Sequence, residues 1–366
     1  MSNPGSETNY VNDYATIPVP LDQRRSSFSL AMVLVGSIIC LSSIYVGASF
    51  VGQLSLSEVV TACLVGNAVL SVLGGLLSYI GTKTGVGIAM LMRHSFGVLG
   101  NYIIAVLTAI VELGWFGYQC GFFGSTIHAM FPNAGFITEP VVAGIWGGLL
   151  MMTTAFIGYK GLELLSNIAS PLILLTCVVA CGLAATRVGG MEQFNQITLA
   201  HTGSMSTAVG IVSVIGAYAM GAVLQPDLTR YGKKCSDSVI GAVFGFIIAN
   251  SFVIIAGFFI CTVADTSDVA VALLNILGSW SLLLLILAQW TTNDNNLYYS
   301  SLAAVVAVPK WKKKYVVITF GIIATVAGAL GIVNYFTTWL SILGTAIPPV
   351  AGILIVDYFC VKHQSY

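Results

Sequence analysis

Charge is what this sequence lacks most. Its 366 residues include only 14 Lys and Arg and 14 Asp and Glu, so 8% of the chain is charged and the formal net charge is zero. Soluble domains are about one quarter charged. A soluble globular protein is therefore excluded, as are disordered and fibrous chains. Zero net charge gives no indication of a nucleic-acid partner, and nothing in the sequence indicates an obligate protein partner.

Patterns typical of enzymes, metal centres and disulfide frameworks are also missing. The sequence contains no HExxH, GxSxG or phosphate-loop motif and no nucleophile–base pair by spacing. Its eight cysteines show no zinc-type spacing with histidines, and most of them fall in apolar runs. We therefore expect buried thiols, no organic cofactor and no enzymatic activity.

Long apolar runs make up most of the chain, which is 57% hydrophobic. A membrane helix needs about 20 apolar residues, and only helices or closed barrels satisfy their backbone in lipid. The runs lack the alternation of barrel strands, so they predict an all-α polytopic membrane protein. An amphipathic segment, 83–99, is expected along one interface. Ten runs qualify as membrane helices: 28–50, 57–81, 101–131, 140–158, 162–185, 206–223, 237–264, 270–290, 315–333 and 336–358.

The few basic residues predict the orientation. With the N-terminus in the cytoplasm, thirteen of the fourteen Lys and Arg residues fall on the cytoplasmic side, and only Arg187 falls outside. This asymmetry is the positive-inside pattern of membrane proteins. It predicts a multi-pass protein of the cytoplasmic (inner) membrane with both termini in the cytoplasm, which agrees with an even number of spans.

Paired landmarks predict an internal repeat. Each half would hold five helices, and an odd number requires the second half to be inverted, as in many secondary transporters. The predicted parts are a tail (1–27), a first repeat (28–185), an external loop (186–205), a second repeat (206–358) and a C-terminal tail (359–366). The landmark pairs, 175 to 180 residues apart, are Gly36 with Gly216, Trp115 with Trp290, and Pro171 with Pro348.

Two of these landmarks suggest broken helices. Gly36 and Gly216 are predicted to interrupt the first and sixth membrane helices. An unwound segment frees backbone carbonyl groups near the middle of the bilayer, where they can hold a cation or a polar ligand. Close packing of helices through small residues would explain the same glycines.

Glu112 is the acid that stands out, because it lies in the middle of the third predicted helix. A charged side chain there costs about 2.5–3.5 kcal/mol and needs a partner, a water-filled cavity or a proton. Trp115 and Gln119 follow at i+3 and i+7, on the same helix face. A carboxylate, an indole and an amide on one face suit a flat polar ligand. Tyr218, near the sixth helix's break, is a candidate for the opposing aromatic wall or a core residue.

A polar stretch ends the eighth predicted helix. Ala288, Thr291 and Thr292 are spaced so that a carbonyl group and two hydroxyl groups share one side. Such hard oxygen ligands suit a cation such as sodium. A helix cap followed by a solvated loop fits equally well, because Asn293 and Asp294 are typical turn formers.

Several blocks of this sequence resemble the cytosine permeases of the nucleobase–cation symporter family. The resemblance implies a LeuT-type fold of two inverted five-helix repeats, and cation-coupled uptake of a base, usually with sodium, by alternating access. Relatives usually continue with two further helices, which this chain, ending at Tyr366, lacks. The blocks keep their order from Pro18 to Tyr358: SYIGTKTG (78–85), RHSFG (93–97), GWFG (114–117), PDLTRYG (226–232), WTTNDNNLYYSSL (290–302) and AIPPVAGILIVDYF (346–359).

The resemblance also implies roles for single residues. Trp115 and Tyr218 would stack on the two faces of the base, with Tyr218 at a position that looks like phenylalanine in the cytosine permeases. The further substrate contacts would be Gly221, Gln119 and Asn293. The implied cation ligands are the carbonyl groups of Gly36, Ile39 and Ala288 and the hydroxyl groups of Thr291 and Thr292.

One departure from the family concerns substrate choice. Glu112 stands where cytosine permeases look to carry glutamine, and a carboxylate only accepts hydrogen bonds whereas an amide also donates. This difference favours a ligand with adjacent donors, such as guanine, or a protonated Glu112 that imitates the amide. The resemblance as a whole implies an importer of cytosine or a related nucleobase, with sodium as the co-transported cation. A purine or hydroxymethylpyrimidine permease, proton-coupled through Glu112, is the alternative. A passive channel or a membrane receptor has less support, since no continuous polar pore or signalling domain is evident.

Overall fold

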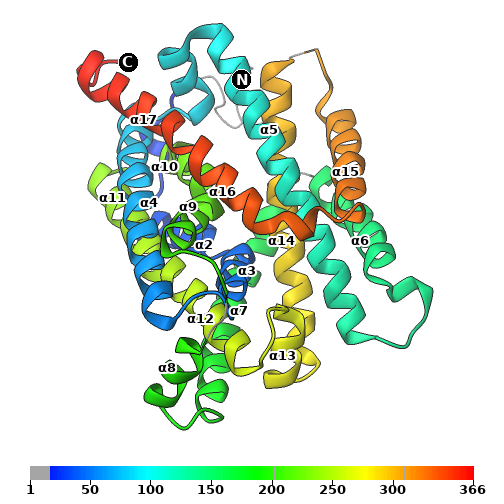
Figure 1. Cartoon of the computed structure of the whole chain (residues 1–366). Coiled ribbons are helices and arrows are strands. Elements are labelled where there is room, and N and C mark those ends of the chain that lie inside the picture. The colour runs from blue at the N-terminus through cyan, green and yellow to red at the C-terminus, as the bar shows by residue number, and fades with distance from the viewer. Residues whose placement is uncertain (1–16, 158, 201–202, 309) are drawn as a thin grey trace.

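The computed structural model describes residues 17–366, apart from 158, 201–202 and 309. Within this part of the chain every regular element is a helix, as expected (Figure 1). Short 3₁₀ turns and two π-helical segments, η3 (Gly245–Asn250) and η5 (Asp357–Val361), join the main helices. These are α2 (Ser27–Ile38), α3 (Leu41–Ser49), α4 (Leu56–Thr84), α5 (Ile88–Met130), α6 (Pro140–Ile157), α7 (Tyr159–Ala185), α8 (Met191–Leu199), α9 (Thr207–Val223), α10 (Gln225–Thr229), α11 (Cys235–Phe244), α12 (Ser251–Val263), α13 (Val269–Leu277), α14 (Trp280–Ala307), α15 (Lys313–Ala329), α16 (Phe336–Ala346) and α17 (Pro348–Val356).

Among the described residues, four continuous helical runs are long and apolar enough to cross a membrane. They are α4, α5, the run Cys235–Val263 and the run Ile332–Val361. Shorter apolar helices lie at Pro140–Ala155, Pro171–Ala185 and Thr207–Val223. Most predicted spans therefore coincide with helices, but α5 begins at Ile88 and includes much of the predicted amphipathic segment. Gly97, with φ of 69°, marks a bend between that segment and the rest of α5.

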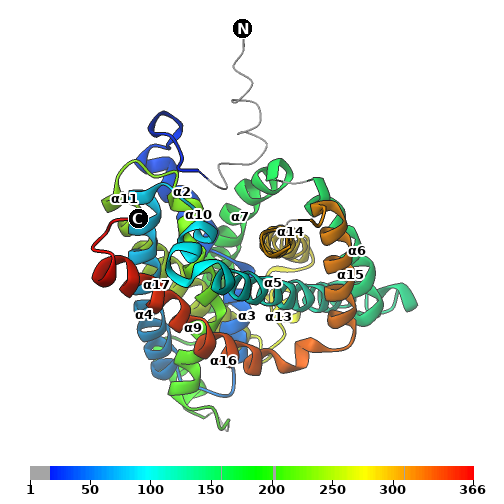
Figure 2. The same cartoon turned by 90° about the horizontal axis from the view of Figure 1, so that it is seen from above.

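The main helices pack as two groups. In the first group, α4 packs on α9 and α11, and α3 packs on α12. In the second group, α5 packs on α14 and α6, and α15 covers both α5 and α6. Figure 2 shows the groups side by side, with α14 seen nearly end-on beside α5. We call the first group, together with α2 and α10, the bundle and the second group the scaffold.

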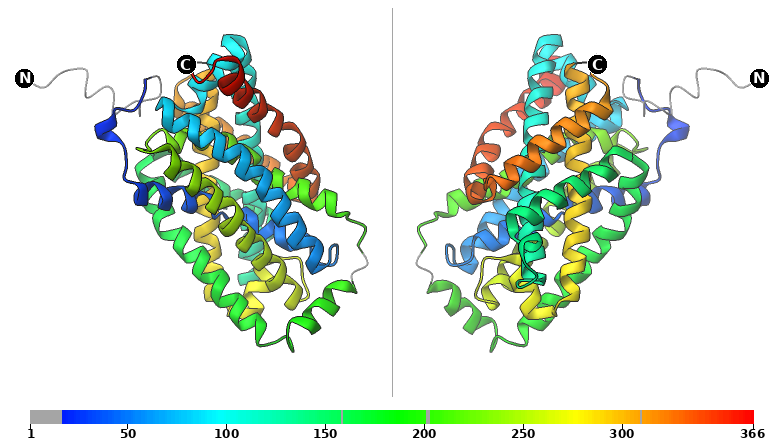
Figure 3. Two further views of the ribbon diagram at one scale, coloured as in Figure 1. Left: turned by 90° about the vertical axis from the view of Figure 1, so that its left-hand side faces the viewer. Right: turned by 90° about the vertical axis from the view of Figure 1, so that its right-hand side faces the viewer.

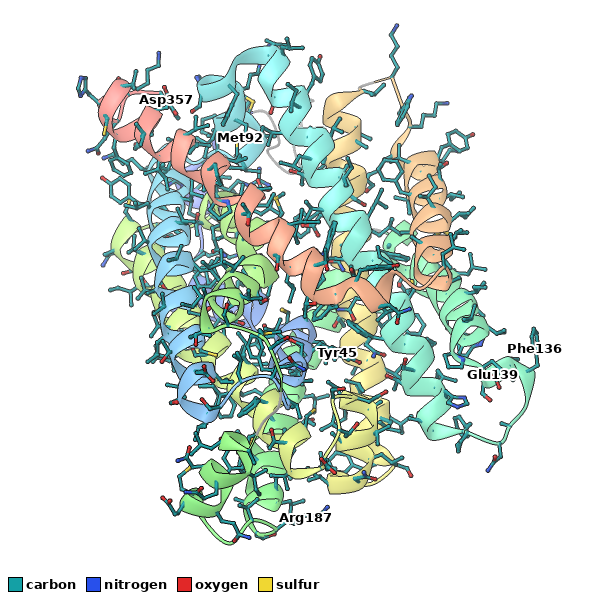
Figure 4. All side chains as sticks on the ribbon, viewed as in Figure 1. Tyr45, Met92, Phe136, Glu139, Arg187 and Asp357 are labelled. Carbon is teal, nitrogen blue, oxygen red and sulfur yellow. The ribbon has the colours of Figure 1, made fainter. Side chains whose placement is uncertain are left out.

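The first described residues and the C-terminus lie at one end of the molecule, and α8 lies at the other (Figure 3). The Val19 N–H donates to the Gly85 carbonyl oxygen at 2.9 Å, so the first described residues lie at the end of α4. The C-terminus and η5 lie at this same end, and α8 lies at the opposite end (Figure 3). Arg187 is near α8, far from Asp357 (Figure 4). Arg187 therefore lies at the end of the molecule opposite both described ends of the chain (Figure 3, Figure 4).

The helices at the eighth predicted span differ from the prediction. The predicted end at residue 290 was wrong, because α14 continues to Ala307, and α13 is a separate short helix. Asn293 and Asp294, interpreted as turn formers, are fully buried within α14. Asp294 Oδ1 lies 2.7 Å from the Thr154 hydroxyl group of α6. A neighbouring helix thus supplies a partner for one oxygen of this carboxyl group, whereas Oδ2 has no hydrogen-bond partner among the described residues. Glu112 is therefore not the only acid deep within a helix.

The first predicted membrane helix is broken in the structure, but not at Gly36. α2 ends at Ile38 and α3 begins at Leu41, so the backbone opens at Ile39 and Cys40. The Ile39 N–H donates to the Val35 carbonyl oxygen at 3.0 Å, and this is a regular helical hydrogen bond. The predicted break at Gly36 was therefore three residues early.

Gly216 does not interrupt a helix. It lies inside α9, which ends at Val223, and α10 follows after a turn at Leu224. A Cβ atom added to Gly216 would lie 1.8 Å from the Leu340 carbonyl oxygen of α16. The predicted break here was wrong, because a glycine at this position allows α9 and α16 to pack closely.

This packing predicts the effect of adding one methyl group. Gly216→Ala forces α9 and α16 apart, and overpacking of this kind costs about 1–3 kcal/mol. Gly182→Ala in α7 is the matched control, because nothing lies within 4 Å of its added Cβ atom. We expect a lower midpoint of thermal unfolding in detergent for Gly216→Ala only. Equal midpoints for the two variants would contradict close contact between α9 and α16.

Candidate ligand and ion site

A cavity of about 760 Å³ lies between the bundle and the scaffold. Its walls come from α2, α9 and α10 of the bundle, from α5 and α14 of the scaffold, and from α7. Arg25 and Phe28, close to the first described residues, also line it, and Phe28 is 77% exposed. The cavity therefore reaches the surface at the end that carries the C-terminus.

Eight of the eleven predicted site residues line this one cavity. They come from opposite groups of helices, because α2 and α9 belong to the bundle and α5 and α14 to the scaffold. The eight are Gly36, Ile39, Glu112, Trp115, Tyr218, Gly221, Thr291 and Thr292. Gln119, Ala288 and Asn293 are buried next to the cavity walls and do not line it.

Glu112 and Trp115 form the scaffold wall on α5. Both side chains are 6% exposed. The indole of Trp115 is held by an edge-on contact with Phe336 at 6.1 Å between ring centroids and a tilted one with Tyr118 at 6.2 Å. Among the described residues, the Glu112 carboxyl group has no hydrogen-bond or ion-pair partner. The wall therefore offers a fixed aromatic surface beside an unsatisfied acid.

Tyr218 forms part of the bundle wall. Its hydroxyl group donates to the Ser37 carbonyl oxygen at 2.5 Å, close to where α2 ends. Its ring meets Phe246 edge-on at 5.3 Å. Gly221 follows one turn later, and a Cβ atom added there would lie 2.2 Å from the Tyr218 ring. The glycine therefore leaves room for the ring at the cavity surface.

Gln119 and Asn293 support the walls from behind. Gln119 Nε2 donates to the Ser42 hydroxyl oxygen at 3.2 Å, and Ser42 itself lines the cavity. Asn293 faces the interior of the scaffold, where Nδ2 lies 3.3 Å from the sulfur of Met151 and 3.6 Å from that of Cys120. The side-chain oxygens of Gln119 and Asn293 have no hydrogen-bond partner among the described residues.

An oxygen cluster lies where α14 faces the broken helix. The hydroxyl groups of Thr291 and Thr292 donate to the Ala288 carbonyl oxygen at 3.0 and 2.9 Å. Gly36 and Ile39 line the same cavity at the end of α2. The described residues contain no cluster of His, Cys, Asp or Glu that could hold a metal ion. Neutral hydroxyl and carbonyl oxygens fit sodium, which would replace one of the two hydrogen bonds to Ala288.

The sequence reasoning missed several cavity residues. Asn295, Asn296 and Tyr299 lie on the cavity side of α14, one and two turns after Thr291 and Thr292. The Asn296 Nδ2 group has no hydrogen-bond partner among the described residues. Helical spacing from Thr291 and Thr292 would have found all three, had the helix not been predicted to end at 290.

The cavity opening predicts which thiols react with a water-soluble reagent. Cys40 lines the cavity at the break of the first helix. In a variant with Cys181, Cys235 and Cys360 changed to Ser, a charged methanethiosulfonate should label Cys40 from the side that carries the C-terminus. The buried Cys63, Cys120, Cys177 and Cys261 should stay unlabelled, and Cys40→Ser should remove the signal. Labelling from the opposite side alone would contradict this opening.

Comparison with known proteins agrees with the resemblance of the sequence blocks. Residues 18–366 match the model of the family described as permease for cytosine/purines, uracil, thiamine, allantoin. The cytosine permease of Escherichia coli (strain K12) is 33% identical over 356 residues, which cover 96% of this chain and 82% of that protein. The purine-uracil permease NCS1 of Arabidopsis thaliana is 24% identical over 97% of this chain and 64% of its own length.

Solved structures share the fold. The inward-facing conformation of Mhp1 superposes with a TM-score of 0.84 at 19% identity, covering 95% of this chain and 80% of Mhp1. Mhp1 in a closed conformation with bromovinylhydantoin bound, described as a nucleobase-cation-symport-1 family transporter, gives 0.80 and covers 95% and 81%. MhsT in complex with L-phenylalanine gives 0.66 at 18% identity, covering 92% and 89%.

The predicted family and the predicted absence of enzymatic activity are both confirmed by these matches. The chain belongs to the family of permeases for cytosine/purines, uracil, thiamine and allantoin, and it is an integral membrane transporter.

Proposed function

We propose that this protein imports cytosine or a related nucleobase across the cytoplasmic membrane, in symport with sodium, by alternating access. One observation carries the proposal. A single cavity joins an unsatisfied acid and two aromatic residues, Glu112, Trp115 and Tyr218, to the oxygen cluster at Thr291 and Thr292. The E. coli relative, named a cytosine permease, supports the choice of substrate class.

A nucleobase suits the walls of this cavity. Its flat ring would stack between Trp115 and Tyr218, and stacking of a base on an aromatic side chain contributes about 1–3 kcal/mol. The polar edge of the base would meet Glu112, whose carboxyl group has no other described partner. Hydrogen bonds to the ligand would then replace those to water that the carboxyl group loses when it is buried.

Sodium would couple the two groups of helices. Gly36 and Ile39 belong to the bundle, and Thr291 and Thr292 belong to the scaffold, so one ion would bridge both. The base would bridge the same groups through Tyr218 and Trp115. Because each ligand favours the same arrangement of the groups, each strengthens the binding of the other, and this coupling is reciprocal.

The proposed topology has ten spans in two inverted repeats. The interrupted pair α2–α3 counts as one span, the continuous runs Cys235–Val263 and Ile332–Val361 count as one span each, and α14 replaces the run 270–290 as the eighth. Each proposed repeat begins with an interrupted helix, at Ile39 in the first and at Leu224 in the second. The position of Arg187 supports an orientation with both termini in the cytoplasm.

An inward-open state fits the two ends of the cavity. The cavity is open at the end that would face the cytoplasm. Toward the other end, the rings of Tyr45 and Phe122 stack at 3.7 Å between centroids, and Phe122 meets Phe336 edge-on at 5.5 Å. The similarity to the inward-facing conformation of Mhp1 supports the same assignment.

Uptake into proteoliposomes tests the proposed function. We expect labelled cytosine or a related base to accumulate with an inward sodium gradient and not without one. Trp115→Ala should weaken binding of the base about 5- to 150-fold, which corresponds to the loss of stacking. Absence of uptake of every base by correctly inserted protein would refute the proposal. Uptake driven by a proton gradient and indifferent to sodium would favour the alternative, in which Glu112 carries the proton.

The acid at position 112 decides which base is preferred. A carboxylate accepts from a ligand with two adjacent N–H donors, which guanine presents, whereas neutral cytosine presents a donor beside an acceptor. If the carboxylate binds the ligand, Glu112→Gln loses the donor-rich purines and keeps or gains cytosine. If the acid form binds, native protein transports cytosine, Glu112→Gln is nearly silent, and native uptake falls as pH rises. Competition of labelled cytosine by guanine, hypoxanthine and hydroxymethylpyrimidine, at two pH values, separates these outcomes.

A further inference from the structure

We infer that the hydroxyl group of Tyr218 is a positioning group for the cation site, and that it links that site to the substrate ring. The inference rests on the proposed function and deepens it. It follows from one hydrogen bond, in which the Tyr218 hydroxyl group donates to the Ser37 carbonyl oxygen at 2.5 Å. A phenylalanine at this position would keep the aromatic wall and lose the bond.

The bond acts on the backbone at the end of α2. Ser37 lies between Gly36 and Ile39, the two bundle residues whose carbonyl groups are the proposed ion ligands. α2 ends at Ile38, and carbonyl groups in the last turn of a helix lack regular partners within it. The phenol supplies a partner for one of them and fixes the peptide between the two proposed ligands. Ion affinity depends on such fixed geometry, because ligands already in place lose little freedom on binding.

The same side chain is also part of the substrate wall. The ring of Tyr218 lines the cavity, and its edge-on contact with Phe246 holds the ring from the other side. A base stacked on this ring restrains the phenol, and the phenol restrains the Ser37 carbonyl group. The substrate and the ion are thus connected through one residue of the bundle, in addition to the closure of the bundle on the scaffold.

Tyr218→Phe tests the inference, because it removes the hydroxyl oxygen alone. The first readout is the stabilisation of purified protein by sodium, measured as a shift of the thermal midpoint without any base. The second is the Kd of labelled cytosine at low and at saturating sodium. We expect the sodium concentration for half-maximal stabilisation to rise about 3- to 10-fold, the range expected for the loss of one hydrogen bond. The Kd of cytosine should rise more at low sodium than at saturating sodium.

Two comparison variants separate the roles. Trp115→Phe changes the opposite wall and should weaken base binding at least as much at saturating sodium as at low sodium, with unchanged stabilisation by sodium alone. Thr292→Ala removes a proposed ion ligand, so adding Tyr218→Phe to it should cause little further loss of the sodium effect. The thermal midpoint without sodium shows that each variant is folded.

The outcomes distinguish this inference from the proposed function. Equal sodium dependence of native protein and Tyr218→Phe overturns the inference alone. An equal loss of base affinity at every sodium concentration also overturns it, because the hydroxyl group would then act only on the base. If sodium does not stabilise the native protein at all, both the sodium coupling and the inference are refuted.

Discussion

Every backbone polar group inside a bilayer needs a hydrogen-bond partner within the protein. The break between α2 and α3 makes this requirement the constraint on which the rest of the structure depends. Opening the backbone at Ile39 and Cys40 leaves helix ends that lipid cannot satisfy. The protein answers with side chains from other helices. The Tyr218 hydroxyl group of α9 donates to the Ser37 carbonyl oxygen at 2.5 Å. The cavity, its polar lining and the proposed ion site all follow from this break.

Close contacts at glycine residues hold α3, the second half of the broken helix, whereas α2, the first half, packs against other helices. A Cβ atom on Gly47 of α3 would lie 1.9 Å from the Ile254 carbonyl oxygen, and one on Gly257 of α12 would lie 2.3 Å from that of Ile44. Backbone thus lies against backbone on both sides of the α3–α12 contact. α2 packs instead on α11 and α7. The break therefore joins two half-helices that belong to different packing environments within the bundle.

The sequence predicted the long helices, and most of its predicted site residues line the cavity, because apolar length and helical spacing are local properties. It failed where the deciding partner lies on another helix. The polar residues of α14 were predicted to form a loop, because the sequence does not show that Thr154 of α6 binds Asp294. Gly216 was predicted to break a helix, because the sequence does not show that the Leu340 backbone of α16 lies against it. Once α14 is continuous, Asn293 lies about 200° around the axis from Thr291 and so faces the scaffold. Gln119 shares a face with Glu112 but lies about 10 Å further along α5, where Ser42 closes the wall.

The size of the cavity also sets how much water takes part in transport. At about 30 Å³ per molecule, 760 Å³ holds on the order of 25 waters, far more than one base displaces. In the proposed alternating access, closing the bundle on the scaffold would expel most of them, and opening would admit them again. Solutes too large to enter the cavity would draw water from it and favour the closed arrangement. Under the proposed mechanism, osmotic pressure would therefore act as a third ligand beside the proposed base and ion.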